Sequence, residues 1–186
     1  MNWNTHSNLR GAHAFLGASK YHWLNYDDKK LRESYLNALA VKRGTELHDF
    51  AATCIRLKQK LPKSAKTLNA YVNDAIGYDM TPEQILYYSE NCFGTADAIS
   101  FWDNTLRVHD LKTGTTPAHM EQLMIYAGLF CLEYRVEPRD IDCELRIYQK
   151  KEVVVHKPSS EELHIITKKI VAADRIISRI RKEQDL

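Results

Sequence analysis

The sequence predicts an α/β fold with a central mixed β-sheet flanked by helices. Residues 28–60 and 158–186 space their apolar side chains as helices do, whereas residues 84–112 change to the pattern of strands. A helical segment over 117–134 then separates these strands from a second strand pair. The resulting order, helix, three strands, helix, two strands and helix, is that of an α/β domain.

The N-terminal part is predicted to be irregular at first and helical afterwards. The first forty residues are rich in aromatic side chains and contain a short helix near Ser19. We expect the helical pattern of residues 28–60 to break at Gly44, because Thr45 can cap a new helix. A further short helix is predicted over residues 67–76.

The central strands are predicted over residues 84–93, 95–102 and 105–112. Thr116 and Pro117 mark the start of the next helix, since proline suits the first helical position. A strand pair turns around Lys150 and Lys151. The final helix opens with a capping box formed by Ser159 and Glu162. It is expected to bury apolar residues at helical spacing along its whole length: Leu163, Ile166, Ile170, Ala173, Ile177 and Ile180.

Length and composition indicate a single globular domain over residues 1–186. The chain has 44% hydrophobic and 27% charged residues, and its net charge of +2 is too small to indicate a polyanionic partner. We divide the domain into an N-terminal segment (1–43), a core (44–157) and a C-terminal helix (158–186). No apolar run approaches the ~18 residues that span a membrane, and the N-terminus lacks a signal-peptide core. We therefore expect a cytoplasmic protein without a membrane partner.

The hairpin over residues 94–114, GTADAISFWDNTLRVHDLKTG, carries charged side chains that strands rarely bury. A two-residue turn at Asp103 and Asn104 would place Asp97 directly opposite Asp110, at the closer, non-hydrogen-bonded kind of pair. Lys112 would share their face of the sheet. Facing carboxylates repel unless something neutralises them, and a divalent metal ion is a natural neutraliser. The alternative is a Lys112–Asp110 ion pair with Asp97 solvated near the sheet end.

Several motifs in and around this hairpin resemble those of the PD-(D/E)XK nuclease superfamily. The similarity is closest to its RecB-type exonuclease branch, which includes CRISPR-associated and phage-encoded nucleases. The residues that carry it are Gly94-x-x-Asp97, Asp110-x-Lys112, Gln122-x-x-x-Tyr126, the helical motif Gly44-Thr-Glu-Leu-His48, and the N-terminal stretch HAFLGASKYHWLNY. The resemblance implies a restriction-endonuclease-like core.

The resemblance also implies a metal site. Asp97, Asp110 and His48 would be ligands of Mg²⁺ or Mn²⁺, with the Leu111 carbonyl as a further ligand. Imidazole suits Mn²⁺ better than Mg²⁺. CRISPR-associated members often hold an iron–sulfur cluster on four cysteines. Here the cysteines stand alone, without a Cys-x-x-Cys pair, so we expect reduced buried thiols and no iron–sulfur cluster.

Catalytic roles follow from the same resemblance. Lys112 would orient the attacking water or stabilise phosphate oxygens. Gln122 and Tyr126, one helical turn apart, would hold Lys112, the water or a DNA phosphate. Without the other motifs, the pair would be an ordinary glutamine and a partly buried tyrosine, and His48 would be a core histidine.

Residues outside these motifs are weaker candidates. Lys150 and Lys151 are candidate DNA-binding residues, and the alternative for such basic positions is a solvated charged surface. Ser19, at an expected helix N-terminus, is a candidate for binding a terminal phosphate of DNA. His109 should face away from Asp110 and serve a structural role. Glu46 and Glu90 are spare carboxylates that we do not place in the site.

The sequence thus predicts a metal-dependent DNA exonuclease that acts on DNA with a free end. It would serve phage or bacterial recombination, replication or repair, in the bacterial cytosol or the host cytoplasm. A recombination partner protein and a homo-oligomer are partners that the resemblance allows. One alternative is a structure-specific or sequence-specific endonuclease, of which the sequence-specific kind is disfavoured because no appended recognition domain is recognised. The other is a nucleic-acid-binding module without catalysis, which the intact Asp97, Asp110 and Lys112 disfavour.

Overall fold

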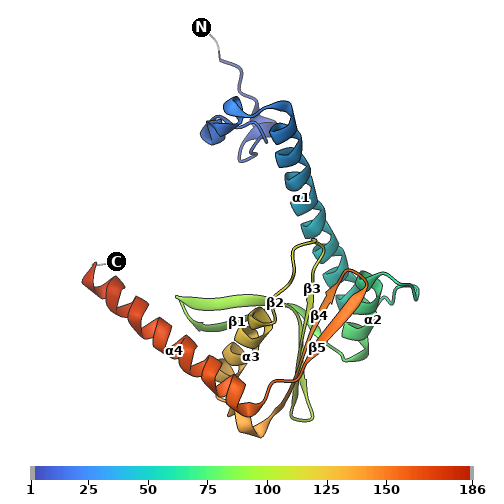
Figure 1. Cartoon of the computed structure of the whole chain (residues 1–186), viewed down its shortest axis with the longest axis vertical. Helices are drawn as coiled ribbons and strands as arrows, with labels where there is room; N and C mark the ends of the chain where they lie inside the picture. Colours follow the sequence, from blue (N-terminus) through green and yellow to red (C-terminus); the bar gives the residue numbers. More distant parts are fainter. Residues whose placement is uncertain (1–2, 185–186) are drawn as a thin grey trace. The chain divides into compact units, whose positions relative to one another are not determined.

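The computed structural model describes residues 3–184, which form two compact units that divide between Thr45 and Glu46 (Figure 1). The first unit contains two 3₁₀ helices, η1 (Ser7–Leu9) and η2 (Ala18–Asn25), and the beginning of helix α1 (Asp28–Arg56). The second unit contains the end of α1, every strand and the remaining helices. No helix of the described residues is long and apolar enough to cross a membrane.

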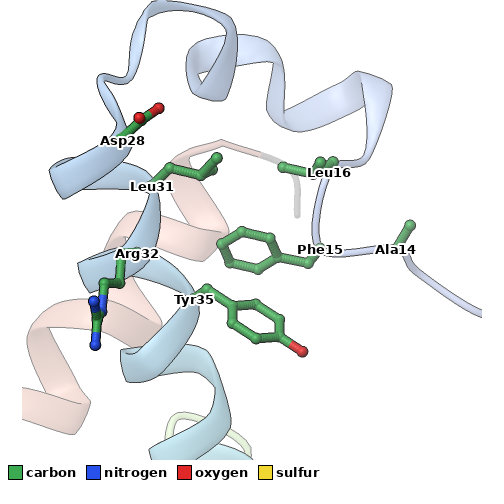
Figure 2. Close-up of a pocket in the computed structure, with 7 residues that line it drawn as sticks. All are labelled: Ala14, Phe15, Leu16, Asp28, Leu31, Arg32 and Tyr35. Carbon is green, nitrogen blue, oxygen red and sulfur yellow. The ribbon is translucent and has the colours of Figure 1, made fainter.

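The N-terminal unit has no buried core, because none of residues 3–45 is buried. It is held by a few local contacts instead. The Trp23 indole nitrogen donates to the Gly17 carbonyl at 3.1 Å, and the Lys30 amide donates to the Asp27 carboxylate at 2.7 Å at the start of α1. Figure 2 shows the Phe15 ring beside Leu31 and Tyr35 of α1, and the centroids of the two rings are 5.1 Å apart.

The second unit is built on a five-stranded mixed sheet, which confirms the predicted fold class. Its strands follow the chain order across the sheet: β1 (Thr81–Ser89), β2 (Cys92–Trp102), β3 (Thr105–Leu111), β4 (Asp142–Gln149) and β5 (Glu152–His156). Strands β3 and β4 are parallel and the other neighbours are antiparallel. Helix α3 (Glu121–Tyr134) therefore makes the crossover that a parallel pair requires.

Two apolar cores cover the sheet. Helices α3 and α4 (Ser160–Glu183) pack on one core, around Leu106, Val108 and Leu145. The other core joins the end of α1 and helix α2 (Thr67–Gly77) to Leu111 and Tyr148. The four cysteines are free, and three of them are buried, as the sequence predicted.

Helix α1 corrects the prediction of a break at Gly44, because it runs without interruption through Gly44 and Thr45. One glycine in a helix interior costs only about 1 kcal/mol. The Thr45 hydroxyl does not cap a new helix but donates to the Val41 carbonyl at 3.3 Å, within the same helix. The helix therefore absorbs both residues.

Helix α3 begins at Glu121, so the predicted start at Thr116 and Pro117 is wrong. A tertiary contact satisfies the backbone there instead. The Gln149 side chain on β4 donates to the carbonyls of Gly114 and Thr116 at 2.9 and 2.7 Å, and accepts from the Ala118 amide at 3.4 Å. The loop before α3 thus has partners that a helical turn would otherwise supply.

The predicted strand over residues 84–93 contains a turn at Glu90 and Asn91, so its last two residues belong to β2. Asn91 in this turn contacts helix α4, where one expectation was wrong. The capping box of Ser159 and Glu162 is present, and Leu163 and Ile170 are buried as expected. Yet Ile177 and Ile180 are 44% and 47% exposed.

The reason is that the apolar core takes up Leu163, Ile166 and Ile170 of α4, but none of the described residues after Ile170. The Asn91 side chain donates to Asp174 at 2.9 Å and to Ser178 at 3.1 Å, and accepts from Arg181 at 2.8 Å. The C-terminal half of α4 therefore contacts this turn through polar side chains, and its isoleucines have no apolar core to enter.

Candidate active site

The β2–β3 hairpin has the register that the sequence predicted. Asp103 and Asn104 form its turn with φ angles of 48° and 53°, and Trp102 pairs with Thr105. The pairing continues to Ala98 and His109, so Asp97 and Asp110 are the next residues along the two strands. The Asp97 carboxylate also accepts the Leu111 amide at 2.9 Å. The two aspartates therefore lie beside each other at one end of the hairpin.

A chain of hydrogen bonds connects the end of β3 to helix α3. The Lys112 ammonium donates to Asp110 Oδ1 at 3.0 Å and to Gln122 Oε1 at 2.9 Å. The Gln122 amide nitrogen then donates to the Tyr126 hydroxyl at 3.2 Å. The structure thus brings together four residues that lie up to sixteen positions apart in the sequence. The Lys112–Asp110 pair is also the ion pair of the alternative interpretation, but Asp97 is not merely solvated beside it.

Gly94 explains how Tyr126 reaches this position. A Cβ atom on Gly94 would lie 3.0 Å from Cε1 of the Tyr126 ring, which is closer than side chains normally pack. The absence of a side chain at Gly94 therefore lets the tyrosine ring lie against β2. The glycine of the Gly94-x-x-Asp97 motif has a packing role in the site.

His48 approaches the aspartates from helix α1. Its Nδ1 lies 3.4 Å from Asp97 Oδ2, and this contact is the main cause that raises the pKa of the imidazole, against the opposing effect of burial. His48 belongs to the same compact unit as the sheet, although it lies close to the unit's first residue. The position of its imidazole next to Asp97 is compatible with a role as a further metal ligand.

Tyr71 on α2 is a neighbour of the site that the sequence did not reveal. Burial raises the pKa of its hydroxyl, and the charges of Asp97 and Asp110 raise it further. An aromatic residue on an apolar helix face is indistinguishable from ordinary core in a sequence. Only the tertiary structure shows that its hydroxyl lies within electrostatic reach of two carboxylates.

Asp110 is the least satisfied charged group of the site. Its side chain is only 2% exposed, and its Oδ2 atom is buried without a hydrogen-bond partner. Burial and the Asp97 charge raise the pKa of Asp110, while Lys112 lowers it. A buried carboxylate oxygen without a partner is costly, so a cation at Oδ2 would stabilise the charged form.

The donor set fits a hard divalent cation. Carboxylate oxygens of Asp97 and Asp110, the Leu111 carbonyl and the His48 imidazole suit Mg²⁺ or Mn²⁺, and imidazole favours Mn²⁺. Among residues 3–184, however, no three His, Cys, Asp or Glu side chains are already gathered in the geometry of a metal site. Metal binding would therefore have to draw these ligands closer, with carbonyl or water ligands completing the set.

The remaining candidates lie elsewhere. Ser19 is an exposed residue of η2 in the N-terminal unit. Lys150 and Lys151 form the exposed β4–β5 turn, with φ angles of 49° and 70°. Glu90 pairs with Arg181 at 3.5 Å, and Glu46 is exposed on α1.

His109 faces away from Asp110, as predicted, and is fully buried. Its Nδ1 lies 3.3 Å from the Tyr148 hydroxyl. Burial, helped by the charges of Arg146 and Arg107, lowers its pKa to about 3. The imidazole is therefore neutral near pH 7.

Comparison with known proteins adds no assignment to this geometry. The sequence matches no model of a known protein family and no curated protein.

Proposed function

We propose that the chain is a metal-dependent DNA nuclease with a restriction-endonuclease-like core of the PD-(D/E)XK type, and that it acts as an exonuclease. One observation carries the proposal. Lys112 donates hydrogen bonds to both Asp110 and Gln122. It does so at the end of the hairpin where Asp97 lies beside Asp110. Two carboxylates, an ammonium and a Gln–Tyr pair are a chemically coherent set for phosphodiester hydrolysis.

The hydrogen bonds of Lys112 leave one of its N–H donors available for a substrate. An ammonium group has three N–H donors, and Asp110 and Gln122 accept two of them. The third can bind a water molecule or a phosphate oxygen. Since the surrounding acceptors fix the position of the ammonium, little reorganisation is needed when negative charge develops on the phosphate.

Gln122 and Tyr126 extend this arrangement. Gln122 accepts from Lys112 with its oxygen and donates to Tyr126 with its nitrogen, so its amide orientation follows from both neighbours. The Tyr126 hydroxyl acts as an acceptor in that bond, which leaves its own O–H free to donate. We assign this donor to a phosphate oxygen of the DNA.

Asp97, Asp110 and His48 would hold the metal ion. When bound, Mg²⁺ or Mn²⁺ would supply charge neutralisation and a more acidic water molecule. The Asp110 Oδ2 atom, which is buried without a partner, is the chain's clearest available ligand atom for it.

The biological setting extends the same proposal. We propose DNA with a free end as substrate, in phage or bacterial recombination, replication or repair in the cytoplasm, with a recombination partner protein or a second copy as further partners. The whole of residues 1–186 would be one nuclease domain. Ser19, Lys150 and Lys151 would contribute phosphate contacts outside the catalytic set.

Digestion of matched DNA substrates tests this function. The chain is incubated with end-labelled linear DNA and covalently closed circular DNA, in Mn²⁺, Mg²⁺ or chelator. An exonuclease degrades the linear DNA in metal and spares the circle, whereas an endonuclease cuts both. The variant Lys112→Ala should lose most of this cleavage, and Lys182→Ala, at an exposed position of α4, is its matched control. If metal ions support no cleavage of either DNA, the proposal fails and a binding module remains.

A further inference from the structure

A pocket with several polar side chains in its lining opens on the sheet face opposite to Asp110. It has a volume of about 570 Å³ and lies between the end of α2 and the turn end of the β2–β3 hairpin. Its lining includes Tyr78, Ser100, Trp102 and Arg107. Because side chains alternate along a strand, Arg107 and Asp110 project from opposite faces of β3. This pocket is therefore separate from the proposed active site.

Arg107 is a cation that lacks an acidic partner among the described residues. Its guanidinium carbon lies 4.7 Å from the centroid of the Tyr78 ring, and its Nε atom is buried without a hydrogen-bond partner. Arg146 lies over the same ring at 5.0 Å, but it is paired with Glu144 at 2.7 Å and with Asp74 at 3.3 Å. Of the two cations on this ring, Arg107 alone has its charge available for a ligand.

The one acidic residue that lines the pocket does not neutralise Arg107. Asp79 is bound to Lys58, whose ammonium lies 2.8 Å from its carboxylate. The lining of the pocket therefore carries an unpaired positive charge, which favours the binding of an anion. An anion that enters it would meet an unpaired guanidinium.

Ser100 and Trp102 complete the lining around Arg107. Ser100 is the cross-strand partner of Arg107, and its hydroxyl oxygen is buried without a hydrogen-bond partner. Trp102, two residues further along β2, shares the face of Ser100 and is 76% exposed. The lining of the pocket thus includes an unpaired guanidinium, a buried hydroxyl and an exposed indole ring.

We propose that this pocket binds a phosphorylated nucleoside, with its phosphate on Arg107 and its base stacked on Trp102. A guanidinium binds phosphate through paired, charge-assisted hydrogen bonds, and indole rings stack on nucleobases. The terminal nitrogens of Arg107 meet the phosphate. The ligand is either a free mononucleotide or a nucleotide within a DNA strand.

Calorimetric titration of the full chain in chelator tests the proposal without any contribution from metal-dependent cleavage. The ligands are dAMP, unphosphorylated deoxyadenosine, and a short 5′-phosphorylated single-stranded oligonucleotide. We expect saturable binding of dAMP or of the oligonucleotide. Deoxyadenosine should bind at least about tenfold more weakly, because a charge-assisted hydrogen bond is lost.

Two variants and one control locate the binding. Arg107→Gln should weaken binding by about tenfold or more, and Trp102→Ala by about fivefold or more. Arg179→Gln, at an exposed position of α4, should bind as the wild type does. Melting temperatures show whether Arg107→Gln is folded. Because Trp102 is exposed, Trp102→Ala is expected to fold like the wild type.

The outcomes separate the two sources of the ligand. If Arg107→Gln and Trp102→Ala weaken binding of dAMP and leave binding of the oligonucleotide unchanged, the ligand is a free nucleotide. If they weaken binding of the oligonucleotide, alone or together with that of dAMP, it is a nucleotide within a strand. The proposal is overturned if no ligand binds, if deoxyadenosine binds as tightly as dAMP, or if both variants bind like the wild type. None of these results bears on the cleavage proposal.

Discussion

Two polar clusters lie on opposite sides of strand β3, and adjacent residues of that strand belong to them. Asp110 is part of the proposed active site, with Asp97, Lys112, Gln122 and Tyr126. His109 belongs to a second group, the His109 cluster, which we define as Asp74, Tyr78, His109, Arg146 and Tyr148. Both clusters are anchored in the same sheet, and both contain charged groups that are partly removed from water.

The His109 cluster is nearly saturated with internal partners. The Tyr148 hydroxyl donates to Asp74 at 2.7 Å, so it accepts from His109 Nδ1, 3.3 Å away. Arg146 donates to Tyr78 at 2.9 Å and is also paired with Asp74. Within the His109 cluster, the buried side-chain atom without a hydrogen-bond partner is His109 Nε2. A network with so few free donors and acceptors stabilises the fold and has little left to offer a ligand.

The proposed active site differs in its spare capacity. Asp110 has a buried oxygen without a partner, Lys112 has an unused donor, and Asp97 and Asp110 together carry more negative charge than Lys112 neutralises. Unsatisfied groups of this kind lower stability unless a ligand completes them. The comparison teaches that the number of unused donors, acceptors and charges, rather than polarity itself, distinguishes a site from a structural network.

The largest expected difference between the clusters is in catalysis. Lys112→Ala should reduce DNA cleavage by about a hundredfold or more, because a cation that stabilises the developing phosphate charge is lost. Tyr148→Phe, which removes a hydroxyl from the His109 cluster, should retain most of the wild-type rate per folded molecule. Cleavage rates with end-labelled DNA, compared at equal folded protein, measure both. A Lys112→Ala rate above about a tenth of the wild-type rate would remove Lys112 from the mechanism.

Metal ions should also distinguish the two clusters. Mn²⁺ at a hundredfold excess over its Kd should stabilise the wild type by about 2.7 kcal/mol. At this chain length, each kcal/mol of added stability raises the melting temperature by roughly 2–4 °C. Asp97→Asn should lose most of this response, yet melt no lower than the wild type in chelator. Its amide oxygen can still accept from the Leu111 amide, and one repulsive charge is gone.

Asp74→Asn is the matched control for Asp97→Asn. It removes a carboxylate that binds Arg146 and Tyr148, so it should lower the melting temperature in chelator and keep the full response to Mn²⁺. Melting curves of the wild type and both variants, with Mn²⁺ and with chelator, test the pair. The reverse pattern, with Asp97→Asn unstable and still responsive to Mn²⁺, would make the facing aspartates a structural network.

The pH dependence of stability should arise in part from His109. Its pKa is lowered to about 3 in the folded protein but lies near 6.5 in the unfolded chain. The unfolded state therefore binds more protons between these values, and stability falls as the pH falls from 6.5 toward 3. At pH 5 the loss should amount to about 2 kcal/mol.

Urea unfolding of the wild type and of His109→Phe at pH 7 and pH 5 measures this contribution. The variant removes the titrating group, so its stability should decrease less between the two pH values. Equal decreases in both proteins would show that His109 is protonated in the folded state more readily than its burial indicates.

The hairpin and its facing aspartates were predictable from the sequence because their determinants are local. A two-residue turn at Asp103 and Asn104 fixes the register, and the register fixes which side chains face each other. The start of α3 was not predictable, because Gln149 on a distant strand satisfies the backbone of Gly114 and Thr116. Such a contact leaves no pattern near the loop itself.

The exposed isoleucines of α4 and the buried Tyr71 also depend on tertiary contacts that the sequence pattern does not predict. The spacing of Ile177 and Ile180 fits a buried helix face, but the apolar core reaches only to Ile170 among the described residues of α4 and leaves both exposed. Tyr71 reads as ordinary core, and only its packing places it near Asp97 and Asp110. Sequence periodicity gives the faces of an element, whereas tertiary partners decide which face is covered.

The smallest expected effect concerns the packing that positions Tyr126. Gly94→Ala would place a methyl group 3.0 Å from the tyrosine ring, so the ring must shift by a few tenths of an ångström. A shift of the hydroxyl weakens its bond to Gln122 and its contact with substrate. We expect cleavage to fall by about threefold to tenfold, which corresponds to roughly 1 kcal/mol.

Gly77→Ala is the control on the other side of the sheet. No atom lies within 4 Å of the Cβ that it would add at the end of α2, so cleavage should not change. A double-mutant cycle with Tyr126→Phe then identifies the route of the Gly94 effect. If Gly94→Ala acts by displacing the Tyr126 hydroxyl, it should cost little further activity once that hydroxyl is absent. If the two losses simply multiply, Gly94 affects cleavage by another path, and the Gln122–Tyr126 bond does not transmit its effect.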